Sequence, residues 1–449
     1  MFTYHVKTAL VSIRRNPVLS ALMVLAIGLG ISVFLSLYTG YHLLQQDPLP
    51  EKSDRVYRVL MDSWGIDFPS PMSQPDEPNF LMTYIDAVNL RRSDIPTHQS
   101  AMYRATVYLH PDRSPDTLRP GQEQLPVRQD LRLAYNDFFP MFDVPFLFGG
   151  PWSDAADENA EPVMVLSRDA NQALFNGEDS VGRRVFVERG LYTVVGVLDA
   201  WRPTPLFYNM LDAGIGTNEP AELFAPFMLG DVNEWPVAGM NSGWKNYEGT
   251  SWAAWTASEQ TWLQYWAQLD DAEQKNAYLD FMDAYAADQK ALGRFPRDPV
   301  NNQLYDIPKW VRAATQQISG AARGFLMIGG LFLLICVTNL VSMLLGKFLE
   351  GNRETALRRA LGAPQSAIFS QRLIEVGMLG VAGGVLGLVF TQALLVGIRR
   401  SFEIPEAYAS LNFYLFSLAL VMALLAGVAA GILPAWRACR VPPASHLNA

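Results

Sequence analysis

The sequence predicts an α-helical membrane protein with four transmembrane helices and a large α+β extracytoplasmic domain inserted between the first and second helices. Half of the 449 residues are hydrophobic and only 18% are charged. The apolar residues gather in four blocks, each longer than the roughly 20 residues that a membrane helix needs. A polar, aromatic-rich stretch with short alternating patterns separates the first block from the other three.

The composition excludes several classes of protein. Disorder does not fit, because the apolar content is high enough to form packed cores. A disulfide scaffold does not fit either, because the two cysteines, Cys336 and Cys439, lie on separate segments in or beside the membrane blocks. With a net charge of −9 and a pI of about 5.2, no nucleic-acid partner is expected.

The apolar blocks define the expected organisation of the chain. We expect a cytoplasmic amphipathic segment at 1–17, membrane helices at 18–44, 320–346, 373–398 and 411–436, an extracytoplasmic domain at 45–319, a cytoplasmic coupling helix at 347–372, a short outer loop at 399–410 and a cytoplasmic tail at 437–449. The first block is interpreted as an uncleaved signal anchor, because a signal-peptide core has only about 7–15 residues. Glycines recur inside the blocks and predict close helix packing.

Lysine and arginine near the membrane ends predict the orientation. The segments 1–17, 347–372 and 437–449 are basic, whereas the remainder of the chain is acidic. Both termini and the coupling helix are therefore expected in the cytoplasm, and the large domain outside. Arg399 and Arg400 in the short outer loop oppose this rule locally but are outnumbered.

The clearest pattern of the outer domain lies between 162 and 198. PVMVL predicts a strand, Ser167 can cap the following helix RDANQALF, and Gly177 and Gly182 are turn positions. RRVFVE and LYTVVGVL then predict two more strands. Alternation in 100–135 predicts further strands, so the domain is expected to be mixed α+β.

An aromatic-rich insertion occupies about 200–292. Its first part, to about 255, suits long ordered loops. From 258 onward a helix is expected, because aromatic and apolar residues recur three and four positions apart. These residues are Trp262, Tyr265, Trp266, Leu269, Tyr278, Phe281, Met282 and Tyr285. Together with two tryptophans just before them, they suggest a substrate or partner face at Trp252, Trp255, Trp262 and Trp266; the alternative is packing on the domain's own sheet.

The segment from Gly351 to Gly384, GNRETALRRALGAPQSAIFSQRLIEVGMLGVAGG, is the most informative. Glu354, Leu357, Arg358 and Leu361 lie at helical spacing, Gly362 ends that helix and Pro364 restarts the chain. A short basic amphipathic helix would therefore join the second and third membrane helices at the inner surface. Such a helix suits anionic lipid headgroups or a groove in a cytoplasmic partner.

This segment resembles a known family. RETALRRALGA…I..QRLIE is similar to the coupling region of FtsX/MacB-type (type VII, mechanotransmission) ABC transporter permeases. GILPAWRACRVPPASHL resembles the family's ending, ALVSIRRNPVLSALMVLAIGLGI its first membrane helix, and the stretch 162–198 its periplasmic core domain. The resemblance implies that 45–319 is a MacB-like core domain in the periplasm, and that the chain lies in the inner membrane of a bacterium.

The resemblance also implies a function. The chain would be a permease subunit that converts movement of a cytoplasmic ATPase into movement of its periplasmic domain and so drives export of a periplasmic or envelope substrate, such as a peptide or antibiotic. The residues that would couple it to the ATPase are Arg353, Glu354, Leu357, Arg358, Arg359, Leu361 and Gly362. Implied partners are the ABC ATPase, a second permease copy or a paralogous permease, membrane lipids, a periplasmic adaptor and an outer-membrane channel.

Two other functions within the same family remain open. The chain could be a regulatory module that controls a cell-wall hydrolase or signals peptide stress. It could also extract lipoproteins from the outer leaflet of the membrane. The four helices and the large outer domain favour export or lipoprotein extraction over regulation.

No motif predicts catalysis by this chain. G-x-x-x-x-G-K-[ST] is absent, so ATP and Mg²⁺ are expected on a separate ATPase subunit, and no enzyme activity or cofactor is expected here. The five histidines are scattered, and His98 and His110 lack further ligands, so no metal site is expected. Glu375, close to Arg372, is expected to form a structural ion pair or a contact with lipid headgroups rather than a proton or ion site.

Overall fold

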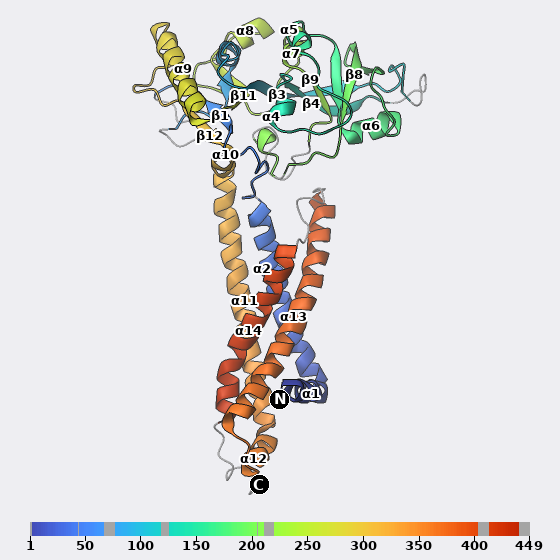
Figure 1. Ribbon diagram of the computed structural model, residues 1–449, viewed down its shortest axis with the longest axis vertical. Coiled ribbons are helices and arrows are strands. Elements are labelled where there is room, and N and C mark those ends of the chain that lie inside the picture. The colour runs from blue at the N-terminus through green and yellow to red at the C-terminus, as the bar shows by residue number, and fades with distance from the viewer. Residues whose placement is uncertain are drawn as a thin grey trace. The chain divides into compact units, whose positions relative to one another are not determined.

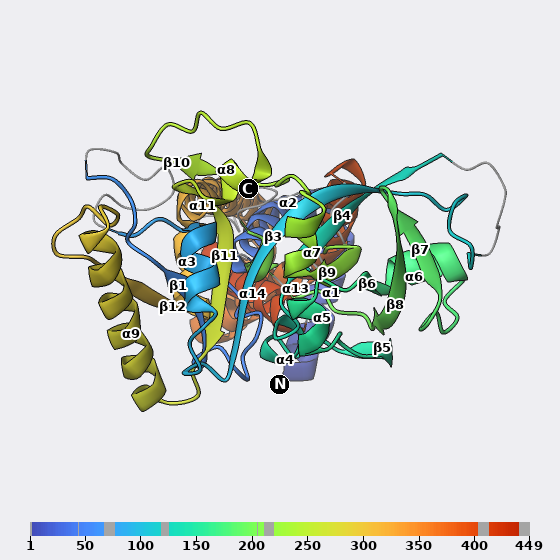
Figure 2. The same ribbon diagram turned by 90° about the horizontal axis from the view of Figure 1, so that it is seen from above.

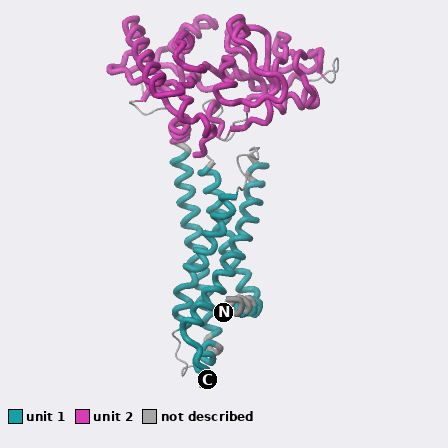
Figure 3. The backbone as a smooth tube through the Cα atoms, viewed as in Figure 1, with its two compact units in different colours: residues 1–44, 317–449 teal, residues 45–316 magenta. Residues whose placement is uncertain are grey.

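The computed structural model describes residues 2–43, 45–66, 77–117, 125–203, 205–210, 220–402 and 413–439. The chain forms two compact units, residues 1–44 with 317–449 and residues 45–316 (Figure 3). The first unit consists of helices, and the second combines a large sheet with short helices (Figure 1). The expected insertion of an α/β domain after the first membrane helix is therefore confirmed.

The helical unit has six described helices. They are α1 (Phe2–Arg15), α2 (Pro17–Leu43), α11 (Gln316–Glu350), α12 (Asn352–Ala360), α13 (Gln365–Phe402) and α14 (Phe413–Cys439). Among the described residues, α2, α11, α13 and α14 are long and apolar enough to cross a membrane, which confirms the four predicted spans. Residues 403–412 and 440–449, which contain most of the expected outer loop and tail, lie outside the described part of the chain.

Small residues allow α13 to approach α2 and α14 closely. A Cβ added at Gly380 would lie 2.7 Å from the carbonyl oxygen of Ala423 on α14. A Cβ added at Gly383 would lie 2.7 Å from the Cβ of Ile27 on α2. Both separations are shorter than ordinary van der Waals contact, so only glycine fits at these two crossings. The interpretation of the glycine pattern as helix packing is confirmed.

The outer domain contains twelve described strands and eight short or medium helices, with one 3₁₀ turn. The strands are β1 (Val56–Leu60), β2 (Met82–Thr83), β3 (His98–Leu109), β4 (Val127–Ala134), β5 (Phe146–Gly149), β6 (Val163–Leu166), β7 (Arg184–Val187), β8 (Gly190–Leu198), β9 (Leu223–Pro226), β10 (Ser242–Gly243), β11 (Gln260–Gln268) and β12 (Gln303–Asp306). The helices are α3 (Tyr84–Leu90), α4 (Phe138–Met141), α5 (Asp154–Glu158), α6 (Arg168–Phe175), α7 (Phe227–Val232), α8 (Trp252–Thr256), α9 (Ala272–Ala291) and α10 (Ile307–Ala314), and the turn is η1 (Phe207–Asn209).

One continuous sheet organises the outer domain. Its order is β12-β1-β11-β3-β4-β9-β6-β8-β5, with β2 and β10 added to β11 and β7 added to β3 and β8. Figure 2 shows the strands in this order across the domain. The pairs β4–β9 and β6–β8 are parallel, and the other pairs on this path are antiparallel. The sheet therefore joins segments from the beginning, middle and end of the domain.

The predictions for 162–198 are confirmed. Val163–Leu166 of the PVMVL stretch forms β6, and the hydroxyl of Ser167 accepts a hydrogen bond from the backbone N–H of Ala170 at 2.9 Å, so it caps α6. Gly177 and Gly182 have φ values of +77° and +84°, in the region that favours glycine. The two predicted strands that follow are β7 and β8.

The helix predicted from 258 is wrong over its first half. Gln260–Gln268 forms β11, and only Ala272–Ala291 is helical. β11 lies between β1 and β3, and eight of its nine residues are buried, so neither face of the strand is exposed to solvent. A strand buried on both faces has no two-residue alternation, and its aromatic residues then match helical spacing by accident. Tyr278 and Met282 on α9 are buried as the spacing predicted.

Candidate functional site

The coupling segment consists of α12 between two membrane-spanning helices. It begins after Gly351 and ends at Ala360; Gly362 follows with a φ of +95°, which confirms the predicted helix end. Ala356 is buried against the rest of the helical unit, whereas Leu357 and Leu361 are 52% and 80% exposed. The helix therefore packs on its own unit with one face and presents two leucines to its surroundings.

The other predicted coupling residues have different environments. Arg358 donates a hydrogen bond to Gln371 Oε1 at 3.0 Å, and Arg359 donates to the backbone oxygen of Cys439 at 3.3 Å. These two arginines thus contact α13 and α14. Arg353 and Glu354 lie in α12, but their side chains fall outside the described residues.

A buried charge cluster adjoins α12. Its centre is Glu375 on α13, whose side chain is 0% exposed. The Glu375 carboxylate forms ion pairs with Lys347 at 2.7 Å and with Arg372 at 3.2 Å. Ser12 on α1 donates a hydrogen bond to the same carboxylate at 2.6 Å. Arg372 also reaches the hydroxyl of Thr355 on α12 at 3.5 Å. The expected pairing of Glu375 with Arg372 is confirmed, and the structure adds Lys347 and Ser12, which sequence reasoning missed.

Gly351 leaves room for this cluster. A Cβ at Gly351 would lie 2.9 Å from the Arg372 guanidinium. The same guanidinium lies over the ring of Phe348, 4.7 Å from its centroid, so α11 also helps to hold it. The junction between α11 and α12 is therefore shaped around Arg372.

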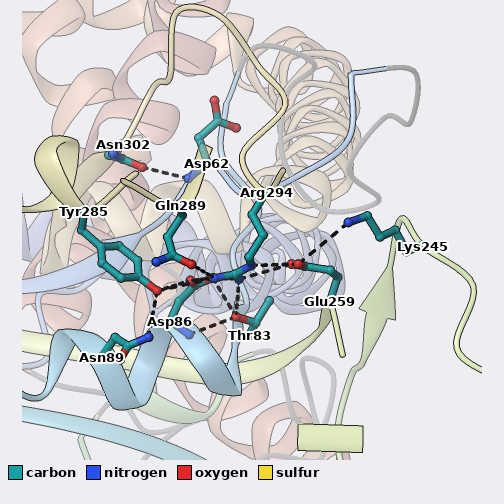
Figure 4. A network of polar contacts seen from close by, with 10 residues as sticks. All are labelled: Asp62, Thr83, Asp86, Asn89, Lys245, Glu259, Tyr285, Gln289, Arg294 and Asn302. Atoms are coloured by element: carbon teal, nitrogen blue, oxygen red, sulfur yellow. Dashed lines mark hydrogen bonds and ion pairs between the residues drawn. The ribbon is translucent and has the colours of Figure 1, made fainter. Parts of the chain in front are cut away.

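A second buried charge cluster lies in the outer domain, centred on Arg294 (Figure 4). Arg294 pairs with Asp86 on α3 at 2.8 Å and with Glu259, immediately before β11, at 2.8 Å. Tyr285 and Gln289 on α9 complete its surroundings through hydrogen bonds. Burial by itself would lower the pKa of Arg294, but the hydrogen bonds and charges of Glu259 and Asp86 raise it overall. The cluster ties α3, α9 and the start of β11 together, which is a structural arrangement.

The four tryptophans of the predicted substrate or partner face divide into two groups. Trp262 and Trp266 are 1% and 0% exposed, so they belong to the core and offer no surface to a ligand. Their place on the central strand β11, rather than on a surface helix, is the reason. Trp252 and Trp255 are half-buried on α8 and pack their rings against Trp262. The alternative interpretation, packing on the domain's own sheet, therefore describes these rings better.

Within the described residues, no group of three or more histidine, cysteine or acidic side chains is arranged to hold a metal ion. Both cysteines are free and buried in the helical unit. A concave apolar surface with a volume of about 610 Å³ lies along α13 and α14, where Leu373, Met378 and Leu424 line it. The polar pocket near Ser167 in the outer domain is smaller, at about 210 Å³.

Two known families match this chain. The MacB-like periplasmic core domain matches residues 20–280, more than half of the sequence, and the FtsX-like permease C-terminal domain matches residues 326–443. These matches cover the first membrane helix with most of the outer domain, and then the last three membrane helices with α12. The chain belongs to the FtsX/MacB-type family of ABC transporter permeases. The two matched domains are the permease part of such transporters.

Curated relatives are similar along most of this chain. The pyoverdine export ATP-binding/permease protein PvdT of Pseudomonas syringae pv. syringae (strain B728a) is 26% identical over 312 residues, which cover 69% of this chain and 41% of PvdT. The macrolide export ATP-binding/permease protein MacB of Rhodopirellula baltica is 22% identical over 314 residues, which cover 67% of this chain and 42% of that protein. The chain thus spans about two fifths of the length of these relatives.

Solved structures of outer domains are also similar. The periplasmic region of MacB from Actinobacillus actinomycetemcomitans aligns with 61% of this chain and 98% of its own length, at 12% identity and a TM-score of 0.35. The extracellular domain of the transporter YknZ from Gram-positive bacteria aligns with 55% of this chain at 11% identity and a TM-score of 0.33. The four apolar helices and the match to the MacB-like periplasmic core domain, rather than these structures, make the chain a multi-pass membrane protein with an extracytoplasmic domain of that class.

Proposed function

We propose that this chain is the permease subunit of an ABC exporter in the inner membrane of a bacterium, with both termini in the cytoplasm and residues 45–316 in the periplasm. A cytoplasmic ABC ATPase binds ATP and Mg²⁺ and moves α12, and this movement reaches the periplasmic domain through the helical unit. The observation that carries the proposal is α12 itself. It packs on the bundle with one face and exposes Leu357 and Leu361 one turn apart.

The exposed leucines suit a protein groove better than water. An amphipathic helix that docks into a groove is recognised through apolar residues three or four positions apart, and Leu357 and Leu361 have this spacing. Arg358 and Arg359 are engaged with α13 and α14, so they orient α12 within its own unit. The proposed contact with the ATPase therefore rests on the leucines, while the arginines transmit the resulting displacement.

The proposed substrate is a molecule taken from the periplasm or envelope. The relatives PvdT and MacB are named for export of pyoverdine and of macrolides, which supports a secreted small molecule, peptide or antibiotic. An adaptor and an outer-membrane channel would carry it onward. A second permease, identical or paralogous, and membrane lipids are the proposed neighbours of α11, whose apolar side chains Met327 and Leu331 are 68% and 61% exposed.

The test is recovery of the ATPase with the tagged full-length chain from gently solubilised native membranes. In the variant Leu357→Ser with Leu361→Ser, we expect recovery of the ATPase to fall at least tenfold, because the exposed apolar face is lost. Leu292→Ser is the matched control, since Leu292 is 75% exposed in the outer domain. Equal recovery from the double variant and from wild type would overturn the proposal, as would the absence of any ABC ATPase from the wild-type sample.

The same experiment separates export from regulation. A periplasmic adaptor recovered together with the ATPase supports export. A cell-wall hydrolase or a sensor kinase in its place would make the chain a regulatory module.

A further inference from the structure

The Glu375 cluster connects more helices than a local ion pair would. Its carboxylate on α13 binds Ser12 on α1 at 2.6 Å and Lys347 on α11 at 2.7 Å. Lys347 reaches Ser20 on α2 at 3.4 Å. Arg372 carries the connection to Thr355 on α12. One carboxylate is therefore linked, directly or through one neighbour, to α1, α2, α11 and α12.

The charges in this cluster depend on that carboxylate. Lys347 is 3% exposed, Arg372 is 13% exposed and Glu375 is fully buried. Both cations pair with Glu375, one on each of its two oxygens. Buried charges are stable only when they are paired and hydrogen-bonded, so neutralising Glu375 removes the ion pair of both cations at once.

The cluster also holds α1. This helix packs Ala9 and Ile13 against the helical unit, whereas Val11 is 68% exposed. Ser12 adds a polar contact at Glu375, the same carboxylate that holds Arg372 against α12. In Figure 1, α1 and α12 lie at the same end of the helical unit. A displacement of α12 therefore has a polar route to α1 that runs through Arg372 and Glu375 of α13.

We propose that Glu375 is a positioning residue that fastens the amphipathic helix α1 to the coupling helix α12, so that both move as one body when the ATPase acts. Glu375 takes no part in proton or ion transfer. The inference rests on the proposed function, because it states which second element follows α12. It makes α1 a lever on the membrane surface rather than a passive anchor, because an amphipathic helix that shifts in the interface displaces lipid.

The test measures distances between paired spin labels in the full chain with its ATPase, purified from native membranes into nanodiscs. Cys336 and Cys439 are first replaced by alanine. One pair, Val11→Cys with Ala360→Cys, reports the α1–α12 separation. A reference pair, Ala360→Cys with Phe413→Cys, reports movement of α12 within the unit. Each labelled chain is first checked for recovery of the ATPase.

In the wild type, ATP with vanadate should shift the reference distance and leave the α1–α12 distance unchanged. In Glu375→Gln, the α1–α12 distribution should broaden at least twofold and shift with nucleotide. Glu375→Asp should restore most of the wild-type behaviour because it keeps the charge. Thr391→Val is the matched control, since Thr391 is also a fully buried polar residue of α13 but bonds only its own helix in the described contacts.

The outcomes distinguish a failure of the role proposed for Glu375 from a failure of the proposed function. An α1–α12 distance in Glu375→Gln that stays narrow and fixed, while the reference pair still shifts, would overturn the inference. A reference pair that never shifts would instead contradict the proposed function, and the nucleotide-free width would still decide whether Glu375 fastens α1. Where Glu375→Gln does not accumulate in the membrane, Ser12→Ala removes only the link to α1, and it should broaden the same distribution.

Discussion

Each of the two units contains a charged cluster centred on one residue, and the two central residues have opposite charges. In the outer domain, the cation Arg294 lies between the carboxylates of Asp86 and Glu259. In the helical unit, the carboxylate of Glu375 lies between the cations Lys347 and Arg372. The first cluster joins a short helix, the start of a central strand and a long helix within one folded domain. The second joins segments on both sides of α12.

The two clusters differ in how many contacts hold their elements together. Arg294 uses all three of its nitrogens on the two carboxylates, with Tyr285, Gln289 and Thr83 around them, so its elements are locked together. Among the described contacts, Arg372 reaches α12 through one long hydrogen bond to Thr355. A locked cluster within one folded domain supports the stability of that domain, whereas a cluster that links α1, α11 and α12 can carry a displacement of α12 to α1.

The largest loss of stability is expected from a change in the locked cluster around Arg294. Arg294→Met should lower the free energy of unfolding of the outer domain by about 3–5 kcal/mol, because Asp86 and Glu259 then lose their shared cation. Arg294→Lys should cost less, since the charge remains but the paired geometry is lost. Urea unfolding of the detergent-solubilised chain, followed by tryptophan fluorescence, measures both. A loss below about 1 kcal/mol in Arg294→Met would remove the contrast between the two clusters.

An intermediate effect on the free energy of unfolding is expected from Asp157, a buried carboxylate whose hydrogen-bond donors are uncharged groups. It accepts hydrogen bonds from Trp152 Nε1 and from the backbone N–H of Asn136, both at 2.7 Å. Burial raises its pKa to about 7, although these hydrogen bonds oppose the rise. The folded state therefore keeps a proton that the unfolded state releases near pH 4. Stability should fall between about pH 4 and about pH 7, by at most about 1.4 kcal/mol per pH unit.

Asp157→Asn should remove this slope, whatever its effect on the absolute stability. Asp154→Asn, an exposed carboxylate of the same helix, is the control and should leave the slope in place. Urea unfolding at a series of pH values from 4 to 8 measures it. A slope that is equal in Asp157→Asn and in wild type would show that Asp157 is not its source.

The smallest expected effect concerns helix contacts without charge. Gly380→Ala should destabilise the helical unit by about 1–3 kcal/mol, because its Cβ would lie 2.7 Å from the backbone of Ala423. Gly397→Ala on the same helix is the matched control, since its Cβ would meet nothing within 4 Å. Thermal unfolding in detergent, with a probe in the membrane helices, compares them. Equal melting temperatures would mean that α13 and α14 separate at little cost.

The membrane helices were predictable because each lies in one long apolar run. The strands β6, β7 and β8 were predictable because short alternating patterns are bounded by glycine turns. β11 was not, because a strand that is buried on both faces loses its alternation. The same loss explains the error at Trp262 and Trp266, whose aromatic spacing indicates burial but not the element that carries it.

In the coupling segment, too, some features were predictable from the sequence and others were not. The end of α12 followed from Gly362 alone, and the pair Arg372–Glu375 followed from its spacing on one helix. Ser12 and Glu375 are 363 positions apart, and no local pattern relates them. A signal for Lys347 did exist, because a lysine directly after an apolar block has either to reach the membrane surface or to find a carboxylate. Which carboxylate it finds depends on the packing of α11 against α13.

The strands β1 and β12 have a consequence for how such a protein changes during evolution. They are antiparallel neighbours, with Val59 opposite Leu304, and the backbone N–H of Ile307 bonds the oxygen of Ser53. The chain thus enters and leaves the outer domain at adjacent points. A domain whose two ends meet works as a cassette, which can be enlarged, reduced or exchanged without rethreading the helices that carry it.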